Sequence, residues 1–206
     1  MGGLAGAARR GGPGPAHLTR WALAVADLSA CATEPLALVL APDAVVALPP
    51  VPDEQSDTRG RARARVLAAL AQAIGVGAGL SARADGVRRL TGTRLFASVA
   101  ERHGWAAAAV ASRPVGVDIE SRAEAEAAAA TVFAGVEADD LAAWHGPAGV
   151  WAAREAVLKA VGRDLTRDPG QWHLAAGVAA APGLSPHRVD LLPLSGVVAA
   201  IAYVGA

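Results

Sequence analysis

The chain has 206 residues, which is enough for one large domain or for two compact domains of about 100 residues each. Its formal net charge is zero and 53% of its residues are hydrophobic, so neither steering toward nucleic acid nor attraction to an anionic membrane is indicated. No apolar run reaches the roughly 18–20 residues that span a bilayer, because acidic residues such as Asp27, Glu34 and Asp43 interrupt the candidates.

The first residues and the single cysteine bear on the cellular compartment. Residues 1–15 are rich in glycine, alanine and proline and lack the apolar core of a signal peptide, so we expect a disordered leader. Cys31 has no second cysteine with which to form a disulfide within the chain, and no cluster of cysteine and histidine offers a zinc site. These features predict a cytoplasmic protein with no membrane or nucleic-acid partner.

The N-terminal part of the chain is predicted to contain short strands followed by one helix. Residues 16–50 alternate apolar stretches with proline and aspartate, which indicates two or three short strands. Residues 59–74 have apolar residues at helical spacing and stop at Gly75, which indicates a helix. The first half of this helix carries four arginines: Arg59, Arg61, Arg63 and Arg65. An irregular stretch is expected over residues 88–94.

The rest of the chain is predicted to alternate strands with helices. We expect strands at 95–99 and 105–111, then a turn and a strand at 115–119, with the last two strands paired as an antiparallel hairpin. Ser121 is a candidate N-cap of the next helix, with Glu124 completing a capping box. Three helices and three further strands are expected: helices 122–132, 137–144 and 151–161, and strands 171–174, 188–192 and 197–204.

The order of strands, helix and strands occurs twice along the chain. It predicts an α+β fold made of two similar α/β halves in a pseudo-twofold arrangement, with an N-terminal half at 16–112 and a C-terminal half at 113–206. Because the sequence shows no obvious internal repeat, this prediction depends on the order of the elements alone.

Two acidic residues share one face of the strand predicted before the first C-terminal helix. Since side chains alternate along a strand, Asp118 and Glu120 lie on one face while Val117 and Ile119 lie on the other. Two carboxylates on an otherwise apolar strand repel each other and resist burial unless a positive group lies between them. Mg²⁺ is a natural candidate, because it takes carboxylate oxygens and leaves room for phosphate oxygens and water.

A carboxylate and an ammonium group share one face of the helix predicted at 151–161. Glu155 and Lys159 are four residues apart, and Gly162 stands where a helix C-cap is expected. Of the 19 basic residues, Lys159 is the only lysine, and a lysine differs from arginine in that its pKa can be lowered enough to move a proton. If this face docks on the strand, Glu155 joins Asp118 and Glu120 around one ion; the alternative is an ordinary surface ion pair.

The strand and the helix together resemble the signature of the 4′-phosphopantetheinyl transferases. Residues 116–120 read GVDIE and residues 151–159 read WAAREAVLK, matching a family pattern of G-[VI]-D-[VI]-E followed by W-x-x-[KR]-E-[AS]-x-x-K. Chain length and the order of strand and helix are similar to the Sfp-type branch, in which a single chain is pseudo-dimeric. The resemblance covers roughly residues 59–161 by motif.

The resemblance implies a role for each matching residue. It implies that Asp118, Glu120 and Glu155 bind Mg²⁺, and that Lys159 contacts phosphate and assists proton transfer. Residues 133–137 resemble a family segment whose glutamate, here Glu137, serves as base toward the carrier-protein serine. The residues that it implies at coenzyme A are Arg59, Arg65, His103, Arg154 and Lys159.

The implied reaction modifies a partner protein. A serine hydroxyl of an acyl or peptidyl carrier protein attacks the β-phosphate of coenzyme A, takes the phosphopantetheine arm and releases 3′,5′-adenosine bisphosphate. The chemistry needs a metal for the phosphoryl charge and a base for the serine, and the residues offer both. A polyketide or nonribosomal peptide pathway is the expected setting, and a pseudo-dimeric chain is expected to be a monomer.

One segment departs from the family pattern. The family has a Ser-His-Ser-like run before the acidic strand, and counting back without gaps places Glu101 where the histidine belongs. A shift of two residues brings His103 to that place instead. This departure leaves open a paralogue that binds coenzyme A or a carrier protein without efficient transfer. A further alternative is a metal-dependent phosphohydrolase that uses the same carboxylates, although it has no motif of its own in the chain.

Overall fold

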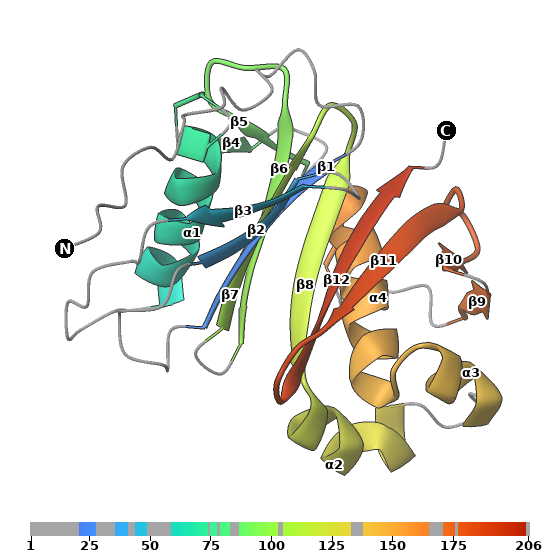
Figure 1. Ribbon diagram of the computed structural model, residues 1–206. Coiled ribbons are helices and arrows are strands. Elements are labelled where there is room, and N and C mark those ends of the chain that lie inside the picture. The colour runs from blue at the N-terminus through green and yellow to red at the C-terminus, as the bar shows by residue number, and fades with distance from the viewer. Residues whose placement is uncertain are drawn as a thin grey trace, which may run out of the picture.

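The computed structural model describes the backbone of residues 21–27, 36–40, 44–48, 59–73, 75–77, 79–82, 87–102, 105–132, 138–164, 171–175 and 177–204. Within these residues the chain forms a mixed α/β fold with two antiparallel sheets (Figure 1). The strands of the first sheet are β1 (Trp21–Asp27), β2 (Leu36–Leu40), β3 (Ala44–Leu48), β4 (Leu80–Ala82), β5 (Arg88–Leu90), β6 (Phe96–Arg102) and β7 (Trp105–Ala111). Those of the second sheet are β8 (Val115–Ser121), β9 (His173–Ala175), β10 (Val178–Ala180), β11 (His187–Pro193) and β12 (Val197–Val204).

Four helices accompany the sheets within the described residues. They are α1 (Arg59–Ala73), α2 (Arg122–Val132), α3 (Ala138–Ala143) and α4 (Pro147–Ala160). Helix α1 packs on β7 and β1 of the first sheet, and α4 packs on β8 and β12 of the second (Figure 1). None of the described helices is both long enough and apolar enough to cross a bilayer.

The main core lies between the two sheets. It is built from the odd-numbered residues of three central strands: Ala107, Ala109 and Ala111 of β7, Val115, Val117 and Ile119 of β8, and Val197, Ala199 and Ile201 of β12. The even-numbered residues of β12, such as Ala200 and Ala202, face α4 instead. Strand β12 is covered on both faces, which explains why its sequence is apolar almost throughout.

The two sheets have the same strand order with respect to the sequence. The first sheet runs β3-β2-β1-β7-β6-β5-β4 and the second runs β8-β12-β11-β10-β9. In each sheet the first strand in sequence pairs with the last one, β1 with β7 and β8 with β12. The strands before the last one then continue toward the edge of the sheet in reverse order of sequence. The hairpin of β2 and β3 extends the first sheet alone.

Several predicted elements are confirmed. The structure has three strands within 16–50, a helix that begins at Arg59, and strands close to the predicted 95–99, 105–111 and 197–204. The N-cap is also confirmed, because Ser121 Oγ accepts the Glu124 N–H at 3.4 Å. The Glu124 carboxylate, however, pairs with Arg102 at 2.7 Å.

The predicted hairpin of residues 105–111 and 115–119 is wrong. Strand β7 pairs with β1 and β6, whereas β8 pairs with β12, so the turn at 112–114 carries the chain from one sheet to the other. The all-apolar β7 is buried on both faces and needs a neighbour on each edge. This central position removes the possibility of pairing with the strand that follows it.

Short strands and one helix start were not predicted. Strands β4, β5 and β10 have three residues each, too few for an alternating pattern to be visible. Helix α4 begins at Pro147, four residues before the predicted start. Proline suits the first turn of a helix, because its missing N–H has no partner there in any case.

Candidate metal centre and active-site cleft

A close approach of α4 to β8 builds the site. Gly116 of β8 lies directly beneath the helix, so that a Cβ at this position would overlap the Ala156 carbonyl group. The helix face that meets the strand is made of small buried residues, among them Ala152, Ala153 and Ala156. Glycine and alanine at the contact therefore bring the longer side chains of α4 within reach of the strand carboxylates.

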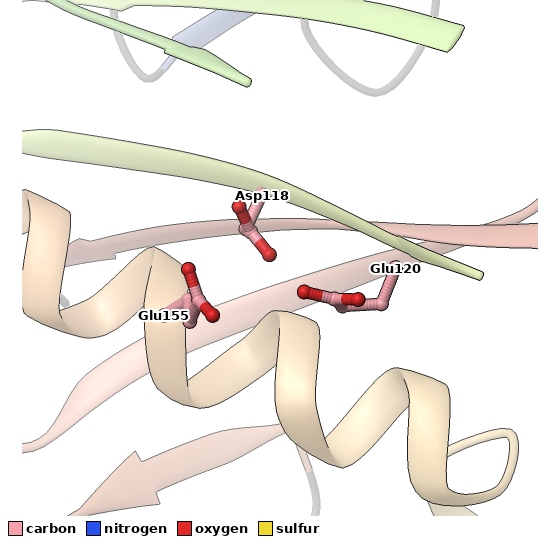
Figure 2. Close-up of side chains that lie close together, drawn as sticks. All are labelled: Asp118, Glu120 and Glu155. Carbon is pink, nitrogen blue, oxygen red and sulfur yellow. The ribbon is translucent and has the colours of Figure 1, made fainter. Parts of the chain in front are cut away.

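Three carboxylates converge at this contact. Asp118 and Glu120 project from β8 and Glu155 from α4, and one oxygen of each lies within 4.8 Å of the others (Figure 2). Asp118 and Glu120 are 5% and 3% exposed, while Glu155 is half-buried. The structure thus brings together the three residues that the sequence predicted as a set.

Lys159 holds one of the three acids. Its Nζ lies 2.5 Å from Asp118 Oδ1 and donates to the Val117 carbonyl oxygen at 3.2 Å. An ammonium group has three N–H donors, so one remains after these two contacts. Lys159 is one turn after Glu155 on α4, which places the ammonium beside the triad rather than on a solvated surface.

The other two acids have partners of their own. Trp151 Nε1 donates to Glu155 Oε1 at 2.8 Å, one turn earlier on the same helix. Arg102, at the end of β6, lies with Nε 3.3 Å from Glu120 Oε2 and with Nη2 2.7 Å from Glu124 Oε2. The triad is therefore held from α4 on one side and from the first sheet on the other.

Burial strongly perturbs the two strand carboxyls. Desolvation raises the pKa of Asp118 to about 6, although the charge of Lys159 opposes the change. Desolvation, together with repulsion from Asp118, raises the pKa of Glu120 to about 8 against the opposing charge of Arg102. Two buried acids at this distance resist being ionised together without a further positive charge.

The donor set fits a divalent cation. Asp118 Oδ2 and Glu120 Oε2 are buried oxygens that have no hydrogen-bond partner among the described residues. Buried polar atoms without partners are rare and costly, and a metal ion is one way to satisfy them. Three carboxylate oxygens are also the hard ligands that Mg²⁺ prefers, so the triad could hold such an ion.

The triad opens into a cleft of about 560 Å³ where β6 faces β8 and the end of α4. Acidic residues of the cleft wall are Glu101, Asp118, Glu120, Glu124, Glu155 and Asp164; basic ones are Arg63, Arg88, Arg102, Lys159 and Arg163. The wall therefore carries basic side chains beside acidic ones. A divalent cation at the triad would offset part of the negative charge, and the cleft would then suit a phosphate-bearing molecule.

The remaining predicted residues lie partly outside the described structure. Backbone positions are described for Arg59 and Arg65 in α1 but their side chains are not, and His103 and Glu137 lie outside the described residues. Arg154 is described, and its guanidinium lies 5.7 Å from the centre of the Trp172 ring rather than in the cleft wall. Glu101, the residue found by ungapped counting, does line the cleft.

Among the contributors to the cleft that sequence reasoning missed are Arg63, Ser98 and Arg102. Arg63 belongs to the arginine cluster of α1, but the register of the helix was not fixed by the sequence. Ser98 Oγ accepts the Val117 N–H at 3.0 Å and so ties β6 to the free edge of β8. Arg102 could not be predicted from local sequence, because its partners Glu120 and Glu124 belong to other elements. The sequence did contain one indication of its role, since it stands next to Glu101 in the segment that departs from the family pattern.

A comparison with known families bears on the same segment. Residues 114–193 match the model of the 4′-phosphopantetheinyl transferase superfamily. The matched segment runs from the start of β8 to the end of β11 and includes Asp118, Glu120, Glu155 and Lys159. No curated protein sequence matches the chain. The part of the chain that carries the acidic triad is therefore the part that is similar to the 4′-phosphopantetheinyl transferase superfamily.

Proposed function

We propose that the protein transfers the 4′-phosphopantetheine arm of coenzyme A to a serine of an acyl or peptidyl carrier protein in a Mg²⁺-dependent reaction. The observation that carries the proposal is the convergence of Asp118, Glu120 and Glu155 beside Lys159 in a charged cleft. The family match over 114–193 supports phosphopantetheinyl transfer in general terms. Holo-carrier-protein synthesis is the specific activity proposed.

Asp118, Glu120 and Glu155 would hold the metal ion. Bound Mg²⁺ supplies positive charge that offsets the negative charge developing on phosphoryl oxygens during transfer. Glu155 is oriented for this task by the hydrogen bond from Trp151. Asp118 and Glu120 are kept in place by the rigid strand β8, which is buried along its whole length.

Lys159 would serve both coenzyme A and the proton transfer. Two of its donors are taken by Asp118 and Val117, and the third can reach a phosphate oxygen in the cleft. The Lys159 ammonium group is thus held by Asp118, one of the proposed metal ligands. The position of the ammonium group would therefore depend on that of the metal centre. A proton delivered from Nζ would assist departure of the bisphosphate leaving group.

Further roles are proposed from the resemblance alone. Glu137 would accept the proton of the carrier-protein serine. At the same time the serine oxygen would form a bond to the β-phosphorus, and the bond between that phosphorus and the oxygen of the leaving 3′,5′-adenosine bisphosphate would break. The coenzyme A contacts would include Arg59, Arg65, His103 and Arg154. For Arg154 the cation–π contact with Trp172 offers a competing structural role.

We also propose that the chain is of the Sfp-type, with halves at 16–112 and 113–206 related by a pseudo-twofold axis. The shared strand order of the two sheets supports this arrangement, as does the packing of one long helix, α1 or α4, on each. A monomeric, cytoplasmic enzyme that serves a polyketide or nonribosomal peptide pathway is the corresponding biological proposal.

One observation favours a second candidate function. Glu101 lines the cleft at the place where the family pattern has a histidine near the phosphates, and a carboxylate there repels them. The second candidate is therefore a paralogue of the same fold that binds coenzyme A or a carrier protein without efficient transfer.

Mass spectrometry of carrier proteins separates the two candidates. The protein is mixed with coenzyme A, Mg²⁺ and several apo carrier proteins, while coenzyme A binding is measured in parallel by calorimetry. A mass gain of one phosphopantetheine arm on at least one carrier supports the transferase. Binding of coenzyme A without any mass gain would instead favour the second candidate.

A further inference from the structure

Arg102 connects the metal centre to the first sheet. Its guanidinium reaches from the end of β6 to Glu120 of β8 and Glu124 of α2, and its side chain is 37% exposed. Among the described residues it is the cation in ion-pair distance of Glu120. Nothing in the reaction proposed above uses this arginine.

The two contacts of Arg102 differ in kind. Nη2 lies 2.7 Å from Glu124 Oε2, a short charge-assisted contact. Nε lies 3.3 Å from Glu120 Oε2, and neither of these two buried atoms has a hydrogen-bond partner among the described residues. The guanidinium is therefore anchored on Glu124 and lies beside Glu120 without a hydrogen bond to it, so it attracts this carboxyl group when the group is ionised.

In this arrangement the Arg102 guanidinium and a metal ion would compete for the same oxygen, Glu120 Oε2. Glu120 Oε2 is a buried atom of a proposed ligand, and it lies 3.3 Å from Arg102 Nε. A divalent ion that takes this oxygen must displace or weaken the ion pair. It is also repelled by a guanidinium that Glu124 keeps nearby.

We infer that Arg102 is an internal competitor of the metal ion, which holds Glu120 in the metal-free protein and lowers the affinity of the triad for divalent cations. Arg102 is thus a positioning residue rather than a catalytic one. The inference rests on the metal site of the proposed function, but it does not depend on the transfer reaction.

Direct metal binding tests this role. Mn²⁺ serves as the probe, and its dissociation constant is measured by electron paramagnetic resonance, without coenzyme A and without oxygen, for the wild-type protein and for Arg102→Gln. The pH is kept above the Glu120 pKa of about 8, so that this carboxyl group is ionised in the metal-free protein. The variant is expected to bind Mn²⁺ about fivefold more tightly, a size suited to an ion pair with one buried and one partly exposed partner. Arg102→Lys, which keeps the charge, is expected to stay closer to the wild-type value.

Arg88→Gln is the matched control. Arg88 lines the same cleft, and no ion pair between it and the triad is found among the described residues. Its removal lowers the charge of the cleft equally, so a change confined to Arg102→Gln isolates the competition for Glu120. Cooperative thermal unfolding shows that each variant is folded, and Arg102→Met replaces the glutamine variant if that one is not.

Two results would overturn the inference, and they can be told apart. Equal or weaker Mn²⁺ binding by Arg102→Gln, with normal binding by the wild type, means that the arginine orients Glu120 instead of competing for it. Absence of Mn²⁺ binding in both proteins removes the metal site itself, and with it the Mg²⁺-dependent reaction proposed above.

Discussion

Each of the three carboxylates has a different partner within the protein. Lys159 contacts Asp118, Arg102 faces Glu120, and Trp151 donates to Glu155. The side chains of these partners differ in charge and reach, so the three acids are not equivalent before any ion arrives. Glu155 accepts its described hydrogen bond from a neutral donor and is the one acid of the three that comes from α4, so we choose it to test the triad as a ligand set.

Replacing Glu155 by glutamine should remove metal binding while preserving shape. Glutamine keeps the volume and can still accept the hydrogen bond from Trp151, but it brings no charge to the ion. We expect Mg²⁺ affinity to fall by roughly tenfold or more, since even groups that only support ligands contribute this much. Calorimetric titration measures the loss, and Glu126→Gln on the exposed face of α2 is the control. Unchanged affinity in Glu155→Gln would remove this residue from the triad.

The buried acids also predict how stability depends on pH when no metal is present. The pKa of Glu120 rises from its ordinary value of 4.5 to about 8 on folding, so the folded state binds more protons than the unfolded state between these values. The free energy of unfolding should therefore fall as pH rises through this window, by on the order of 3 kcal/mol between pH 5 and pH 8.

Glu120→Gln tests that dependence, because glutamine cannot ionise. Urea unfolding in the presence of a chelator should show a much smaller loss of stability for the variant between pH 5 and pH 8 than for the wild type. The remaining loss is assigned to Asp118, whose pKa is raised to about 6. A wild-type protein whose stability increases across this range would contradict the account of the buried carboxyls.

At the scale of elements, the contact of β8 with α4 determines whether the acids meet. Gly116 lies beneath the Ala156 carbonyl, and the Schellman-type end of α4 fixes where the helix stops. There, Gly162 N–H donates to Lys159 O at 3.2 Å and Arg163 N–H to Leu158 O at 2.8 Å, with Gly162 at φ 71°. The helix is thus fixed close to the strand along its length and at its end.

Gly116→Ala should therefore disturb both packing and the metal site. The added methyl group meets backbone atoms that cannot rotate away, so α4 must shift. We expect a loss of stability of about 1–3 kcal/mol, the usual range for overpacking, and weaker Mg²⁺ binding in the folded fraction. Urea unfolding and metal titration measure the two effects. Gly77→Ala, where open space surrounds the added methyl, should show neither; equal behaviour of the two variants would contradict this role of Gly116.

At the scale of the whole molecule, the sequence predicted the site better than the topology. The acidic pair on β8 and the Glu155–Lys159 spacing on α4 follow from the periods of strands and helices, so their convergence could be foreseen. The partner of β7 could not be predicted, because a uniformly apolar strand made mostly of alanine carries no signal for which strand it pairs with. Contacts that join elements distant in the sequence, such as Ser98 with Val117 and Arg102 with Glu120, could not be predicted either, because local sequence patterns do not show which elements meet.

The cleft itself is a product of the whole fold. Its walls come from α1, β5, β6, β8, α2 and α4, so neither sheet alone provides both the three carboxylates and the arginines of the cleft. Functional sites are common where two packed substructures meet, because a concave surface forms between them. We therefore expect one cleft to hold the divalent ion and the pyrophosphate of coenzyme A together.

A crystal structure with Mn²⁺ and coenzyme A tests this claim most directly. We expect an anomalous Mn²⁺ peak among Asp118, Glu120 and Glu155, with the pyrophosphate of coenzyme A in contact with the ion and with Lys159. The same map shows whether Glu101 or His103 faces the phosphates. A metal peak away from the three carboxylates, or coenzyme A bound outside the cleft, would contradict the account.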